Sequence, residues 1–76
     1  MTLDQAESIR IELEDEGFNA FVHEDYSGRG MFGKTCVGIS TDASGVLVGF
    51  LLAKHGAEYN ELPNRSDSMG YERIYY

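Results

Sequence analysis

The 76 residues predict one α+β domain, spanning residues 1–76, in which two helices cover one face of an antiparallel sheet of three or four strands. Three observations support this fold class: apolar residues at helical spacing near the start, two central segments that alternate as strands do, and a later apolar run bounded by capping residues. The resulting order is α-β-β-α-β, with or without a fourth short strand, which is typical of helices packed on one side of a sheet.

The first helix is expected at about residues 3–16. Thr2 and Gln5 form the sequence pattern of a capping box, and Gly17 is a natural stop. The apolar residues that repeat at helical spacing are Ala6, Ile9 and Leu13. They predict an inward stripe, and Ile11 falls among the acidic residues of the opposite side.

Two strands are expected in the middle of the chain, at Phe18 to Tyr26 and at Lys34 to Thr41, because both segments alternate or are rich in β-branched residues. The segment YSGRGMFG between them predicts a long hairpin loop, since glycine adopts positive φ angles without steric cost. The segment AEYNELPN is expected to be a connector. The C-terminal SDSMGYERIYY predicts one interrupted strand or a tight hairpin.

The apolar run VLVGFLLA predicts a second helix at about residues 43–55. Periodicity alone does not distinguish a helix from a strand in so short a run. The flanks favour a helix, because residues 41–44 offer N-caps and residues 54–56 form a cationic end closed by glycine. We expect this helix to be buried, with Gly49 allowing close packing.

The net charge of −7 is concentrated in one part of the chain. Residues 1–25 hold eight acids and one base, whereas residues 26–76 hold five of each. Such a field repels phosphate backbones and attracts basic surfaces. We therefore expect a basic protein partner and no direct binding of nucleic acid.

The sequence also argues against a secreted, a membrane-spanning or a disulfide-bonded protein. The first residues are acidic and do not resemble a signal peptide. The longest apolar run falls well short of the roughly 20 residues that span a bilayer, so a soluble protein without a membrane association is expected. The single cysteine, Cys36, excludes an internal disulfide and fits a reducing cytosol.

The stretch GRGMFGKT, residues 28–35, matches the phosphate-loop pattern of nucleotide hydrolases. That loop needs a helix beginning at its Lys-Thr, and here β-branched residues follow instead. Two readings of residues 27–34 stay open. The glycine amides form an anion site with Arg29 and Lys34, or Met31 and Phe32 pack back onto the sheet while the two cations pair with nearby acids.

Other candidates for chemistry are weak. Cys36 lies in the middle of a strand and fits a small buried hydrophobe. His23 and Asp25 share one strand face, but they lack a third ligand, so no metal site is expected. We expect no catalytic residue, no cofactor and no enzymatic activity.

The segments YSGRGMFGKTCVGI and DSMGYERIYY resemble small, uncharacterised proteins encoded by bacteriophages. The resemblance covers less than half of the chain and implies a setting, a phage accessory protein acting in a bacterial cytoplasm. Small acidic phage proteins often block host defences, as anti-CRISPR and anti-restriction proteins do. The resemblance transfers no functional residue.

The leading hypothesis is therefore an inhibitor that binds a basic, nucleic-acid-handling surface of a host defence protein or nucleoprotein complex. The residues expected at the partner interface are, on the first helix, Asp4, Glu7, Ile11, Glu12, Glu14 and Asp15, and, around the loop, Tyr26, Arg29, Met31, Phe32 and Lys34. One alternative is a binder of a nucleotide or phosphate signal that uses loop 27–34. Another is a homo-oligomeric structural protein joined through the tyrosine-rich C-terminal strand.

Overall fold

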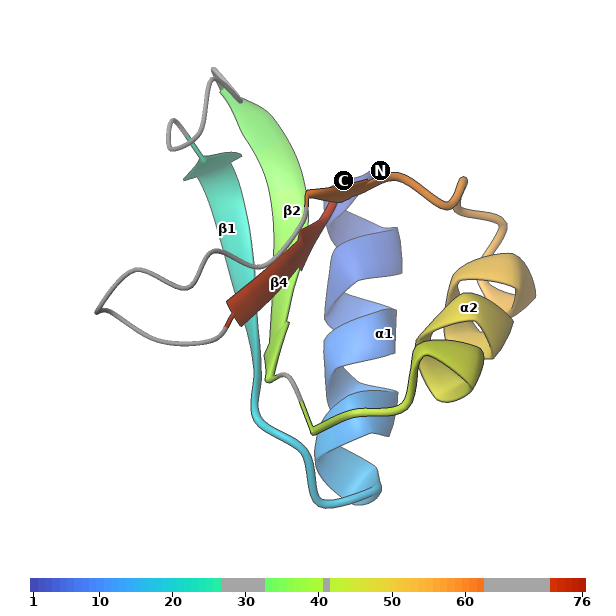
Figure 1. The fold of residues 1–76 in the computed structure, drawn as a ribbon. Helices are drawn as coiled ribbons and strands as arrows, with labels where there is room; N and C mark the ends of the chain where they lie inside the picture. The colour runs from blue at the N-terminus through green and yellow to red at the C-terminus, as the bar shows by residue number, and fades with distance from the viewer. Residues whose placement is uncertain (27–32, 41, 63–71) are drawn as a thin grey trace.

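A computed structural model describes residues 1–26, 33–40, 42–62 and 72–76 of the chain. Its elements are α1 (Leu3–Asp15), β1 (Ala20–Tyr26), β2 (Lys34–Ser40), α2 (Gly45–Lys54), β3 (Glu61–Leu62) and β4 (Glu72–Tyr75). The order α-β-β-α-β-β with an antiparallel sheet confirms the predicted α+β class (Figure 1).

The four strands form one sheet in the order β1-β2-β4-β3. β4 lies between β2 and β3, and Ile74 faces Gly38 on one side and Leu62 on the other. The C-terminal strand is thus paired on both sides at this point, and an oligomer joined along it would have to displace β3. The short strand β3 lies in the segment predicted as a connector, so that prediction was wrong for Glu61 and Leu62.

The start of α1 has the local structure that its sequence predicts. The Thr2 hydroxyl accepts a hydrogen bond from the Gln5 amide at 3.1 Å, and the Gln5 side chain accepts one from the Thr2 amide at 2.9 Å. This capping box satisfies two of the amides that a helix N-terminus leaves free. At the other end Gly17 follows with φ of 91°, a conformation that glycine adopts readily.

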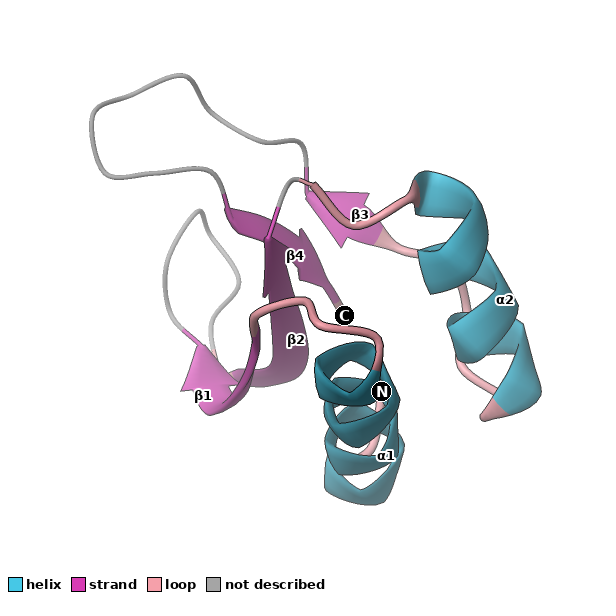
Figure 2. Cartoon of the chain, turned by 90° about the horizontal axis from the view of Figure 1, so that it is seen from below, coloured by secondary structure: helices cyan, strands magenta, loops and turns pink. Residues whose placement is uncertain are grey.

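Both helices lie on the same side of the sheet, as predicted (Figures 1 and 2). α1 lies directly on β1 and β2, and α2 lies beside α1. The two helices and the sheet share one buried cluster, whose largest members are Ile9, Leu13, Val37, Ile39, Leu52 and Tyr75. The other face of the sheet has a smaller cluster of Cys36 and Ile74, against which Tyr26, Leu62 and Tyr76 pack. Burial raises the pKa of the Cys36 thiol, as expected of a small buried hydrophobe.

The prediction that α2 is buried on all sides was wrong. Val48, Leu51 and Leu52 face the core, but 85% of Val46 and 63% of Phe50 are exposed. A side chain at Gly49 would meet only the Tyr59 ring, at an ordinary contact distance of 4.0 Å, so no close helix packing depends on this glycine. One side of α2 is therefore an apolar surface in contact with water.

Tyr75 is fully buried, and its ring meets that of Tyr59 edge to face with centroids 5.6 Å apart. Among the described residues its hydroxyl has no hydrogen-bond partner. Burial is the main reason that the pKa of this hydroxyl is raised. The ring therefore stabilises the core, while the hydroxyl works against it.

We expect Tyr75→Phe to increase the free energy of unfolding by about 1 kcal/mol, because an unpaired buried hydroxyl costs roughly 1–3 kcal/mol and the ring contacts are kept. Urea unfolding followed by circular dichroism measures the change. Tyr59→Phe is the comparison, since that exposed hydroxyl donates a hydrogen bond to Glu61 at 2.6 Å and its loss should not raise stability. A clear loss of stability in Tyr75→Phe would contradict the expectation.

Candidate protein-interaction site

Two of the acids predicted at the interface pair with a base on their own helix. Arg10 contacts the Glu7 carboxylate at 3.0 Å and the Glu14 carboxylate at 3.0 Å, one turn away on either side. Hydrogen bonds to Glu7 and then to Glu14 raise the pKa of Arg10. Glu7 and Glu14 therefore form ion pairs within their own helix. Their contact with a partner stays a prediction, because exposed pairs of this kind are weak.

Glu12 is also engaged within the molecule. Its carboxylate accepts a hydrogen bond from the Lys54 ammonium at 2.6 Å and contacts the His55 ring nitrogen with its other oxygen. These hydrogen bonds, from Lys54 first and His55 second, lower the pKa of Glu12. We call these three residues the helix clamp, because they join α1 to the end of α2. The role of Glu12 as a partner contact stays a prediction.

Three carboxylates of this region have no cationic partner among the described residues, namely Asp4, Asp15 and Glu16. Asp4 and Asp15 lie on the side of α1 that faces away from the sheet, and Ile11 lies between them with half of its surface exposed. This outer side of α1 therefore combines unpaired negative charge with one exposed apolar residue.

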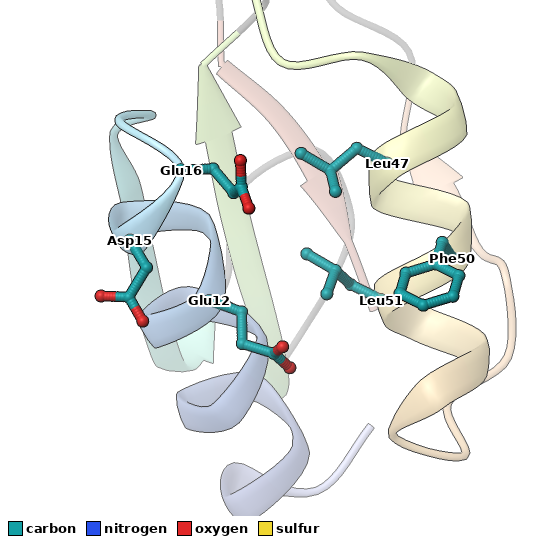
Figure 3. A pocket seen from close by; sticks show the side chains of 6 residues that line it. All are labelled: Glu12, Asp15, Glu16, Leu47, Phe50 and Leu51. Atoms are coloured by element: carbon teal, nitrogen blue, oxygen red, sulfur yellow. The ribbon is translucent and has the colours of Figure 1, made fainter.

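A groove of about 190 Å³ separates the C-terminal half of α1 from the N-terminal half of α2 (Figure 3). Its lining residues are Glu12, Asp15, Glu16, Leu47, Phe50 and Leu51. Figure 3 shows Glu12 and Glu16 turned toward α2, with Leu47 and Leu51 opposite them and Asp15 pointing outward at the rim. One wall of the groove is thus acidic and the other apolar.

The groove has a defined width because the two helices are joined on one side of it. Besides the helix clamp, the Gln5 side chain donates a hydrogen bond to the His55 carbonyl oxygen at 3.0 Å. Gln5 therefore caps its own helix and also binds the end of α2.

Of the predicted loop contacts, the structure describes only Tyr26 and Lys34. Tyr26 and Lys34 are register partners where β1 and β2 meet the loop, and Tyr26 packs on the sheet face opposite the helices. Arg29, Met31 and Phe32 lie outside the described residues. The loop therefore stays a predicted second contact, and ligand binding by loop 27–34 also stays a prediction.

In the described part of the chain, no three histidine, cysteine or acidic side chains are grouped as metal ligands. The strand register shifts between His23 and Tyr26, so the alternation that would align His23 with Asp25 is interrupted there. His23 instead contacts the Tyr26 ring, with centroids 5.1 Å apart.

Sequence reasoning missed four residues of the groove: Glu16, Leu47, Phe50 and Leu51. The acidic cluster at the end of α1 was visible, and the spacing of Val46, Phe50 and Ala53 marks a second side of α2. An all-apolar helix, however, gives no contrast between its sides, so the sequence could not tell which side the core would cover.

Comparison with protein-family models, with curated proteins and with solved structures finds no match for this chain. Among the described residues, none of the helices has both the length and the apolar character that crossing a bilayer requires. The assignment of a function therefore depends on the geometry of the groove between α1 and α2.

Because the pKa of Glu12 is lowered in the folded state, its ionised form stabilises the fold above the unfolded value of about 4.3, and this contribution is lost as the pH falls through the lower, folded value. We expect Glu12→Gln to lower the melting temperature at pH 7 and to match the wild type at about pH 2. Thermal unfolding at a series of pH values tests this. Glu58→Gln, an exposed control away from the clamp, should match the wild type throughout. An equal deficit of Glu12→Gln at both pH values would show that the carboxylate acts through packing.

Proposed function

We propose that this chain is a non-enzymatic inhibitor of the anti-CRISPR or anti-restriction kind. It binds the basic, nucleic-acid-handling surface of a host defence protein in the bacterial cytoplasm. The binding surface is the α1–α2 face, which we define as Asp15 and Glu16 of the first helix region and Leu47 and Phe50 of α2.

One observation carries this proposal: unpaired carboxylates lie beside exposed large apolar side chains on the same side of the molecule. Asp15 and Glu16 form one rim of the groove, and Phe50 forms the other. Leu47 and Phe50 line the same groove, and exposed apolar side chains that gather in one place mark interaction sites, whereas single scattered ones do not. The combination is typical of a protein interface in which aromatic side chains hold the complex and charges surround them.

The end of α1 gives a second reason. Glu14, Asp15 and Glu16 stand at the negative end of the helix dipole, and the last turn contains no base. Carboxylates at this position cost stability, typically about 0.3–1 kcal/mol each. Only Glu14 has an ion-pair partner among the described residues. A small domain that keeps such charges at an unfavourable position is expected to use them for something other than folding.

The proposal is tested by capturing partners from a bacterial lysate at low and high salt, identifying the bound protein, and measuring nuclease activity of that protein with and without the chain. Inhibition of a nucleic-acid-processing enzyme, with affinity that falls as salt rises, is expected. The proposal would be refuted if the amount of captured partner changed neither with the salt concentration nor with substitutions in the α1–α2 face.

Asp15→Lys separates function from stability, because the two should change in opposite directions. A cation at the end of α1 suits the helix dipole, so we expect the free energy of unfolding to rise by about 0.3–1 kcal/mol. We expect association with the partner to slow several-fold, since charges around an interface mainly set the rate of encounter. Stopped-flow binding and urea unfolding measure the two effects.

Glu58→Lys is the matched control, with the same change in net charge at an exposed position outside the α1–α2 face. It should bind faster than Asp15→Lys. Equal rates for the two variants would mean that only total charge matters.

Phe50→Ala tests the apolar half of the face. The side chain is mostly exposed, so its removal should leave the free energy of unfolding within about 0.5 kcal/mol of the wild type. We expect the dissociation constant for the partner to rise about tenfold or more, as at an interface hot spot. Phe21→Ala is the control, because Phe21 is 58% exposed but lies on the sheet face away from the helices. An equal loss of partner affinity in Phe50→Ala and Phe21→Ala would contradict the assignment of Phe50 to the interface.

A further inference from the structure

The groove between α1 and α2 has the chemistry of a site for one long cationic side chain. Glu16 faces the groove and lacks a cationic partner among the described residues, whereas Glu12 is already held by the helix clamp. Leu47, Leu51 and Phe50 supply the opposite wall. An acidic wall alone would bind a small cation equally well, but the apolar wall needs an occupant with its own apolar surface.

The size of the groove restricts the occupant further. A volume of about 190 Å³ is below the roughly 300–1,000 Å³ of sites that enclose drug-sized ligands. A single side chain is therefore a better match than a whole cofactor. Arginine has an apolar stem that can lie along leucine side chains and a charged head that stays near water. Its planar guanidinium stacks on aromatic rings and binds carboxylates with two hydrogen bonds.

From this match we infer that the groove binds an arginine side chain of the partner, with the guanidinium at Glu16 and the stem against Leu47, Leu51 and Phe50. The inference rests on the proposed function and adds the chemical identity of the anchor residue. Charge complementarity selects this occupant over a second copy of the chain, because two molecules of net charge −7 repel one another and each would bring acids to the acidic wall.

The test uses a capped five-residue peptide with a central arginine flanked by alanine and leucine, and the same peptide with citrulline, which has nearly the same shape but no charge. Titration followed by amide chemical shifts in nuclear magnetic resonance gives both affinities. We expect the arginine peptide to bind at least about tenfold more tightly. The largest shifts should fall on Glu16, Leu47 and Leu51. Equal affinities, or shifts confined to other residues, would overturn the inference.

Glu16→Gln should reduce the preference for arginine to within about twofold, and it should still fold, because only a surface charge changes. Glu58→Gln has the same charge change outside the groove and should keep the full preference. Loss of preference in both variants would mean that overall charge decides, which also overturns the inference.

The outcomes distinguish this inference from the proposed function. If Glu16→Gln binds the captured host protein as tightly as the wild type does, the arginine anchor is wrong and the broader interface stands. If no nuclease is inhibited but the arginine preference and its loss in Glu16→Gln are seen, the groove assignment holds and the proposed function fails.

Discussion

The packing of α1 on one face of the sheet is the interaction on which the rest of the structure depends. Its inward side chains Ala6, Ile9 and Leu13 are fully buried, and Ile9 and Leu13 join the core cluster that the sheet and α2 share. A chain of 76 residues supports only one modest core. α2 therefore shares that core from the side and buries only Val48, Leu51 and Leu52. Its other apolar side chains stay in water, and the candidate site is a consequence of this limit.

The acids of α1 then fall into two groups by position. Glu7, Glu12 and Glu14 reach bases on α1 or α2 and contribute to the fold, each by a modest amount because the pairs are exposed. Asp15 and Glu16 lie closer to the C-terminal end of α1 than Glu12 does, and neither has a cationic partner among the described residues. The same clamp that neutralises one carboxylate thus sets the width of the groove where the unpaired ones lie.

Local features of the chain were predictable and long-range ones were not. The capping box of Thr2 and Gln5 and the apolar spacing of α1 depend on neighbouring residues, so the sequence displays them directly. The contact between Glu12 and Lys54 joins residues 42 positions apart, and nothing in the sequence marks it. β3 escaped prediction because two residues are too few to alternate. The exposed side of α2 escaped it because both sides of that helix are apolar, and only the size of the core decides which one is covered.

The composition of the α1–α2 face also separates two ways in which an acidic protein can block a nucleic-acid-handling surface. A mimic of the nucleic acid backbone needs regularly spaced charges and little else, because phosphate sites bind charge without base-specific contacts. Here Leu47 and Phe50 line the groove together with the acids, and three of the five acids of α1 are already paired. Such a surface gains its affinity from desolvated apolar anchors, with charge guiding the encounter. The α1–α2 face is therefore suited to a partner on which a basic patch borders an apolar patch. Fewer proteins have such a surface than have a basic groove that accepts any nucleic acid.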